Sequence, residues 1–405
     1  MRSRMPQERP MSHQALFLAA STGAAQVLVA LLYLVAAREV SPSEFGSTVS
    51  AIALGTAAAG FVDFGTNNHW TRELARRALA DQTFVDRLFS KLAITVGAAL
   101  LWCAGVAILF PGSALWLAGP ITVALVANQA YQVPLRSAAR GELVALVILA
   151  DRVFASVLFF VMVAADVSAP TALWIALSAG SIGAAVVGRS MSPCNLRRRP
   201  RLSNPWSGAH YFGLTVVANS SQALDLTLLS AAAGPAAAGV YGAVNRWTQP
   251  MSLLAAAFSS ALAPYAARST SLRGAWSELR RAIWMPLAAI AVSIAVYFAA
   301  PFIVGILLGG SYEGSAATLQ ILALVVIPSI ICQPLVVVLQ SFQRDRYVAI
   351  VMVIAAIGQL ALVLVLGGSA GALGAAHAAL IAQLFILVSL LGGTVSLARS
   401  TRRKP

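Results

Sequence analysis

Residues 89–110 read FSKLAITVGAALLWCAGVAILF and hold one charged side chain in 22 positions. A helix rises 1.5 Å per residue, so this stretch reaches about 33 Å, close to the thickness of the hydrocarbon core of a bilayer. A stretch this long and this apolar predicts a transmembrane helix.

The rest of the chain repeats this pattern. Its 405 residues are 59% hydrophobic and only 10% charged, with a mean hydropathy of +0.80. Soluble domains carry about 25% charged residues, so the composition excludes an ordinary soluble enzyme, a disordered chain and a nucleic-acid-binding domain. We therefore predict an all-α polytopic membrane protein. About twelve transmembrane helices are expected, at 14–37, 47–69, 89–110, 114–135, 143–165, 171–189, 210–231, 238–265, 283–307, 316–340, 347–367 and 371–397.

Basic residues gather between alternate apolar runs. If both termini lie in the cytoplasm, 26 of the 28 Arg and Lys residues fall in cytoplasmic segments. This count includes Lys91 and Arg152, and it leaves out Arg38 and Arg246. An excess of positive charge is typical of cytoplasmic loops, so we predict cytoplasmic N- and C-termini. The basic cluster 197–201 is in addition a candidate contact for anionic lipid headgroups.

A short motif occurs twice. Pro42 and Gly46 enclose three residues after the first run, and Pro235 and Gly239 do the same 193 positions later. We expect both motifs to form short turns between spans. The duplication predicts two six-helix pseudo-symmetric lobes around a central cavity, a layout typical of transporters. The expected parts are an N-terminal lobe over 1–195, a basic cytoplasmic linker over 196–209, and a C-terminal lobe over 210–405 with a basic cytoplasmic tail.

Several further motifs resemble one known family. They are Arg38-x-x-Ser41-Pro42-x-Glu44-Phe45-Gly46, Asp63-Phe64-Gly65, Arg72-Glu73, Asp225-x-x-Leu228-Leu229, Gly239-Val240-Tyr241, Arg246, Gly309-Gly310-Ser311-Tyr312 and Gly371-Ala372-Leu373-Gly374-Ala375-Ala376. Their order along nearly the whole chain resembles the Wzx-like polysaccharide flippases of the multidrug/oligosaccharidyl-lipid/polysaccharide (MOP) exporter superfamily.

The resemblance implies a function. Such flippases move an undecaprenyl-pyrophosphate-linked oligosaccharide from the inner to the outer leaflet of the bacterial cytoplasmic membrane. The sugar head passes through the cavity between the lobes while the polyprenyl tail stays in lipid. The implied partners are the lipid-linked oligosaccharide and membrane lipids. A polysaccharide polymerase and glycosyltransferases are further candidate partners.

Two opposite charges lie at similar depth in neighbouring spans. Asp225 is about 9 Å from the outer end of its span and Arg246 about 12 Å, at 1.5 Å per residue. Charged groups within spans are costly and are candidates for function. One interpretation is an ion pair that fixes the two helices. In the other, Arg246 binds the substrate pyrophosphate, because guanidinium is planar and bidentate, and Asp225 is its switchable partner.

Polar side chains surround this pair. Asn245 and Gln249 are four positions apart and so share a helix face with each other. Tyr241 and Gln222 add hydroxyl and amide groups that suit sugar hydroxyls. The predicted substrate-binding residues are therefore Arg246, Asp225, Asn245, Gln249, Tyr241 and Gln222.

A second polar group lies at the inner end of the second span. Asp63, Asn67, Asn68 and Arg72 follow one another there and predict a cytoplasmic gate or mouth, with interfacial anchoring as the alternative. Arg38, at the other end of the first span, is expected to pair with Glu39 or Glu44.

No catalytic set or metal motif is present in the sequence. The three cysteines and four histidines have no ligand spacing, so we expect neither a metal site nor a cofactor. The protein is expected to be a transporter and not an enzyme. A cation-coupled multidrug exporter of the same superfamily is one alternative, although only Asp63 and Asp225 supply acids within the spans. A non-transporting scaffold for polysaccharide-synthesis enzymes is the other.

Overall fold

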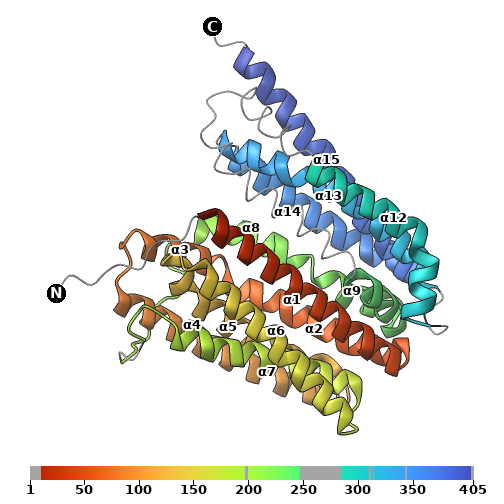
Figure 1. The fold of residues 1–405 in the computed structure, drawn as a ribbon, viewed down its shortest axis with the longest axis horizontal. Helices are drawn as coiled ribbons and strands as arrows, with labels where there is room; N and C mark the ends of the chain where they lie inside the picture. The colour runs from red at the N-terminus through yellow and green to blue at the C-terminus, as the bar shows by residue number, and fades with distance from the viewer. Residues whose placement is uncertain are drawn as a thin grey trace.

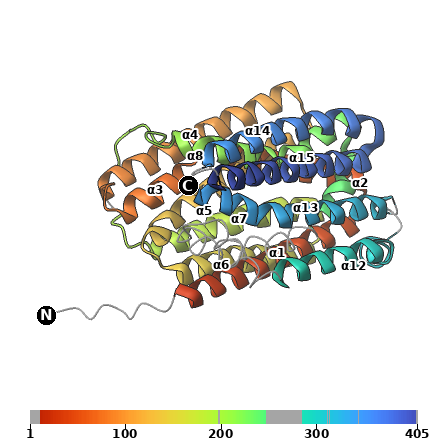
Figure 2. The ribbon, with the colours of Figure 1, turned by 90° about the horizontal axis from the view of Figure 1, so that it is seen from above.

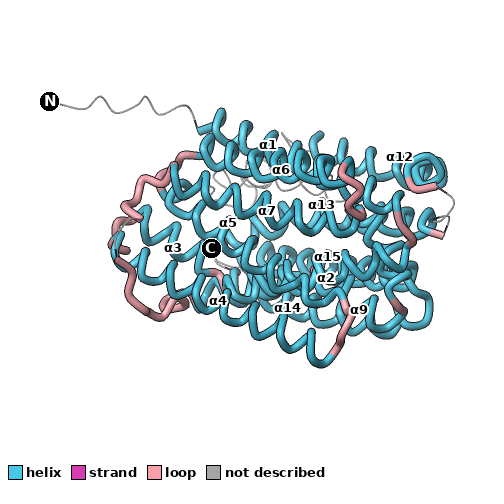
Figure 3. Tube along the Cα trace, turned by 90° about the horizontal axis from the view of Figure 1, so that it is seen from below, coloured by secondary structure: helices cyan, strands magenta, loops and turns pink. Residues whose placement is uncertain are grey.

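The computed structural model describes residues 11–196, 199–246, 284–309, 312, 314–342 and 344–402. These residues form helices and connecting loops without any strand (Figure 3). The first half contains α1 (Met11–Glu39), α2 (Pro42–Asp63), α3 (Thr66–Ala75), α4 (Asp81–Leu109), η1 (Ala114–Leu117), α5 (Ala118–Ser137), α6 (Gly141–Ala164) and α7 (Ala169–Ser190). The second contains α8 (His210–Ser221), α9 (Leu224–Ala233), a helix described over 235–246, α12 (Trp284–Leu307), α13 (Ser315–Ser341), α14 (Asp345–Leu362), η3 (Val363–Gly367) and α15 (Gly368–Arg402).

The chain is a polytopic all-α membrane protein, as predicted. Eight stretches of the described residues are long and apolar enough to cross a membrane, and the last of them covers both α14 and α15. The predicted span 238–265 is described only up to residue 246, where it is helical.

Three details of the predicted spans differ from the structure. The span 47–69 ends at Asp63, because Phe64 and Gly65 adopt left-handed backbone angles and α3 then begins in a new direction. The span 210–231 is divided into α8 and α9. The loop expected at 368–370 is a kink within α15, at Ala370 and Gly371.

The helices form two lobes that meet at one end. We call the end that carries Arg72, Arg136 and Arg189 the basic end, and the end that carries Gly46 and Gly112 the opposite end. In Figure 1, α12–α15 approach the N-terminal lobe at the right of the view and diverge from it toward the C terminus. Figure 2 shows the same helices from above, running roughly parallel along the bundle.

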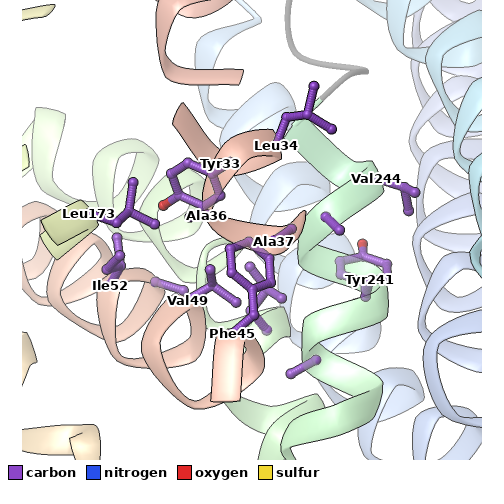
Figure 4. Packing of buried hydrophobic residues seen from close by; sticks show 14 of the residues in the cluster. Tyr33, Leu34, Ala36, Ala37, Phe45, Val49, Ile52, Leu173, Tyr241 and Val244 are labelled. Carbon is purple, nitrogen blue, oxygen red and sulfur yellow. The ribbon is translucent and has the colours of Figure 1, made fainter. Parts of the chain in front are cut away.

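The buried apolar residues follow this division. The largest cluster joins both lobes at the opposite end and includes Phe45, Tyr241 and Leu319 (Figure 4). At the basic end each lobe has its own cluster, one around Trp70 in the first half and one around Leu339 in the second. Lipid tails are as apolar as these side chains, so close packing between helices holds the lobes together. The shared cluster therefore closes the lobes at the opposite end.

The two copies of the duplicated motif contact each other where the lobes are closed. A Cβ atom on Gly46 would overlap the carbonyl oxygen of Pro235, and one on Gly239 would overlap that of Pro42. The two motifs therefore face each other reciprocally across the lobes. Both motifs form the first turn of a helix, whereas we predicted short turns between spans. Proline suits the first turn of a helix because its φ is already fixed, and because the N–H that it lacks would have no hydrogen-bond partner there. Ser41 caps α2 by accepting a hydrogen bond from the Glu44 amide (3.3 Å).

The segment 199–209 packs on the N-terminal lobe at the basic end. The Arg201 amide donates to Asp86 Oδ1 (2.9 Å), and the Ser203 amide donates to Ser90 Oγ (2.8 Å). The Trp206 indole donates to the Val62 carbonyl (2.9 Å) at the end of α2. This segment, within the predicted linker 196–209, is thus attached to α2 and α4.

Candidate functional site

A cavity of about 300 Å³ lies between α2 and the helices of the C-terminal lobe. Five of the six predicted substrate-binding residues line it, and the sixth, Gln249, lies outside the described residues. The lining consists of Ala53, Thr56, Gln222, Ala223, Asp225, Leu226, Tyr241, Asn245, Arg246, Leu322, Val325, Val326, Ser329, Gln359, Ala379 and Gln383. Sequence reasoning missed Thr56, Ser329, Gln359 and Gln383, which come from four other helices.

Asp225 is held at the first turn of α9. Its carboxylate accepts hydrogen bonds from the Tyr241 hydroxyl (3.1 Å) and from the Leu226 amide (2.6 Å). Both Asp225 and Tyr241 are buried. The break between α8 and α9 exposes amide groups at the start of α9, and this is where a carboxylate is stabilised.

Arg246 reaches across to the other lobe. One of its terminal guanidinium nitrogens donates to the Tyr33 hydroxyl (3.1 Å), and its guanidinium carbon lies 4.5 Å from the centre of the Tyr33 ring. Tyr33 belongs to α1 and is buried in the core that joins the lobes. Arg246 therefore bridges the two lobes at the cavity wall.

One of the two interpretations of Asp225 and Arg246 was an ion pair, and no salt bridge joins them in the described part of the chain. The recorded partners of Asp225 are Tyr241 and the backbone of Leu226, and the Arg246 guanidinium turns toward Tyr33. The two side chains line the same cavity, and the Tyr241 hydroxyl contacts the carboxylate of Asp225. Arg38 likewise forms no ion pair with Glu39 or Glu44 among the described residues.

The predicted gate residues separate into two groups. Asp63 is buried, and its carboxylate binds the Lys91 ammonium at 2.6 Å. Lys91 also donates to Asn67 Oδ1 (3.2 Å), whereas Asn68 and Arg72 are exposed on α3. Asp63 in addition accepts hydrogen bonds from the Thr66 hydroxyl (3.0 Å) and the Asn67 amide (3.2 Å), which caps α3.

Lys91 was counted among the charges of the cytoplasmic segments, and the structure places it inside a helix instead. Its side chain is 0% exposed, and it lies inside α4, which begins ten residues earlier at Asp81. Its ammonium is neutralised by Asp63 and lies 5.0 Å from the Trp70 ring centre. Lys91 lies within the predicted span 89–110, and this position already indicated that it is not a loop residue.

Asp151 is a third acid within the spans, which the sequence analysis omitted. It is buried in α6 and accepts a hydrogen bond from Asn128 Nδ2 (2.9 Å). Gln132 donates to Asn128 (2.8 Å), and Arg136 donates to Gln132 (2.9 Å), so a chain of polar contacts follows α5 toward the basic end. Arg152, also counted as a loop charge, lies beside Asp151 within α6, at 3.5 Å. None of these residues lines the cavity of Arg246.

Metal ligands do not gather anywhere in the described residues. No group of three or more His, Cys, Asp or Glu side chains could hold an ion there. Among the described lining residues, the chemistry of the cavity is that of one guanidinium, one hydrogen-bonded carboxylate and several amides and hydroxyls.

This arrangement is the fold of two-lobe, twelve-helix membrane transporters. Solved structures that share it are MOP superfamily proteins. An inward-facing multidrug resistance MATE family transporter of that superfamily matches with a TM-score of 0.72 at 16% identity, over 94% of this chain and 96% of that chain. The lipid II flippase MurJ in an inward closed conformation matches with a TM-score of 0.72 at 12% identity, over 94% and 87%.

The similarity lies in the fold, since the identities are low. No protein-family model and no curated protein sequence matches the chain. An outward-facing MATE family structure matches with a lower TM-score, 0.59, at 16% identity over 98% of both chains.

Proposed function

We propose that this protein is a flippase that translocates a polyprenyl-pyrophosphate-linked oligosaccharide across the bacterial cytoplasmic membrane by alternating access. The observation that carries the proposal is the position of Arg246. It lines a polar cavity between the lobes, where a positive charge is costly unless it serves a ligand or a partner.

The charges of the cavity favour an anionic substrate. Among the described lining residues, Arg246 is the base and Asp225 the acid. The carboxylate of Asp225 already accepts hydrogen bonds from Tyr241 and a backbone amide. A guanidinium can bind two phosphate oxygens in parallel, which suits a pyrophosphate. An exporter of cationic drugs would be better served by a cavity rich in acids.

Amide and hydroxyl groups around Arg246 suit a sugar. Gln222, Asn245, Gln359 and Gln383 can each donate to and accept from hydroxyl groups. The cavity of about 300 Å³ is at the small end of ligand pockets, so it fits the pyrophosphate and the first sugar rather than a whole oligosaccharide. The remaining sugars and the polyprenyl chain lie outside it in this account.

The bridge between Arg246 and Tyr33 offers a link from binding to movement. A bound pyrophosphate would compete with the Tyr33 hydroxyl for the guanidinium, and Tyr33 belongs to the other lobe. Loading the substrate would therefore remove one contact between the lobes. If the basic end is cytoplasmic, as the arginine distribution predicts, loading takes place from the inner leaflet.

The test uses a strain that lacks the gene and is complemented with variants. Wild type should clear lipid-linked oligosaccharide from the inner leaflet, whereas Arg246→Ala should accumulate it there, with transport reduced roughly 100-fold, because a charge-assisted bidentate contact is lost. Arg246→Lys should reduce transport roughly tenfold, since an ammonium lacks the planar fork. Arg399→Ala is the matched control, because it removes the same charge from the exposed last turns of α15. Normal leaflet distribution in Arg246→Ala would reject the proposal.

A further inference from the structure

A second cavity lies in the N-terminal lobe at the opposite end. Its volume is about 530 Å³, and its lining comes from the start of α2, the end of α4, the loop 110–113, η1 and the start of α7. It is separate from the cavity of Arg246, and no residue lines both. The lining residues used below are Glu44, Thr48, Trp116, Thr171 and Trp174.

Two tryptophans form one wall. The rings of Trp116 and Trp174 meet edge to face, with centroids 5.3 Å apart and an interplanar angle of 79°. Trp116 is 40% exposed, so part of its surface is free to contact a ligand. The face of a sugar ring is covered with C–H groups that carry partial positive charge, and it packs well on an aromatic face.

Polar groups form the other wall. Glu44 and Thr48 are four positions apart and share one face of α2. The Glu44 side chain is exposed and has no ion pair among the described residues. A carboxylate beside hydroxyl groups and an aromatic wall is the combination that binds a sugar, since the hydroxyls of the sugar donate to the acid while its ring packs on the indole.

The cavity lies next to the closure of the lobes. Gly46 lies between Glu44 and Thr48 in the sequence and faces the other way, against Pro235 at the closure of the lobes. Thr48 is about 12 Å along α2 from Thr56 of the Arg246 cavity, at 1.5 Å per residue. A glycan of a few sugars spans that distance, and a single sugar does not.

We infer that this cavity, around Trp116, Trp174 and Glu44, binds the distal sugars of the glycan once the lobes have separated at the opposite end, while the pyrophosphate is still at Arg246. The inference rests on the proposed function and adds a second point of contact. Because all of its lining belongs to one lobe, the site keeps its shape when the lobes separate and then lies at the outer mouth.

The test compares two substrates in proteoliposomes. One is undecaprenyl pyrophosphate that carries a single hexose, and the other carries a tetrasaccharide. Trp174→Leu and Glu44→Gln should each slow transport of the tetrasaccharide form about three- to tenfold and leave the single-hexose form unchanged, because only the longer glycan reaches the site. Phe160→Leu is the control: it removes an exposed aromatic ring from the same lobe, away from the cavity. Thermal unfolding of each variant shows that it is folded.

The outcomes separate the two claims. Equal rates for variants and wild type with both substrates overturn the sugar site and leave the tryptophans as interfacial anchors. Equal slowing of both substrates also overturns it, since the effect is then independent of glycan length. The sugar site is also overturned if the wild-type protein transports the single-hexose form but not the tetrasaccharide form. If wild type moves neither substrate, the proposed function itself fails, and this inference falls with it.

Discussion

At the scale of single residues, the buried pair of Lys91 and Asp63 predicts a large loss of stability when one partner is removed. Their side chains are 0% and 9% exposed, so removing one leaves the other as an uncompensated buried charge. Lys91→Ala should destabilise the protein by about 3–5 kcal/mol, and Lys91→Met combined with Asp63→Asn should recover most of the loss. Thermal unfolding in detergent measures both. Arg72→Ala, on the exposed face of α3, should change the midpoint little, and a Lys91→Ala midpoint equal to it would contradict the pair's role.

Cys194 gives a prediction for pH. Burial and the neighbouring Asp81 raise the pKa of this thiol to about 11, and it lies outside the membrane-spanning helices. A raised pKa keeps the thiol protonated at neutral pH, and alkylation requires the thiolate. In a variant without Cys103 and Cys332, the rate of alkylation should therefore rise with pH until about 11. Asp81→Asn should move this rise to lower pH, and an unchanged profile would show that Asp81 has no effect.

At the scale of elements, the contact between the first turns of α2 and helix 235–246 holds the opposite end closed. A methyl group at Gly46 or Gly239 would overlap a carbonyl oxygen of the facing turn. Gly46→Ala and Gly239→Ala should each force the turns apart and lower stability by about 1–3 kcal/mol. The matched control is Gly97→Ala, within α4 and without neighbours within 4 Å, which should be neutral or slightly stabilising. Equal unfolding midpoints for the three variants would contradict this account of the closure.

The elements also show what the sequence could predict and what it could not. Apolar runs located the helices, because length and hydropathy are local properties. The break at Phe64 and Gly65 depends on left-handed backbone angles there, together with the Asp63 cap of α3. Lys91 and Asp151 both lie within predicted spans. Their partners come from other helices, so the contacts of Lys91 with Asp63 and of Asp151 with Asn128 required the structure. The cavity around Arg246 was predictable in part, since Asp225, Tyr241 and Arg246 lie in adjacent spans.

At the scale of the whole molecule, the orientation in the membrane is a direct prediction. If the basic end is cytoplasmic, a cysteine at Asn68 should react with a membrane-impermeant maleimide only after cells are permeabilised. A cysteine at Ala165, exposed at the opposite end, should react in intact spheroplasts. Both are introduced into a variant without the three native cysteines. The reverse labelling pattern would invert the orientation predicted from the arginine distribution.

The central claim is that the cavity around Arg246 carries a pyrophosphate-linked glycan across the bilayer, and reconstituted flipping tests it most directly. Purified protein is placed in liposomes with a fluorescent undecaprenyl-pyrophosphate-linked oligosaccharide, and exposure of the glycan on each leaflet is followed with a membrane-impermeant quencher. Wild type should equilibrate the lipid between leaflets, and Arg246→Ala should slow this roughly 100-fold. Equal rates for wild type, Arg246→Ala and protein-free liposomes would contradict the account.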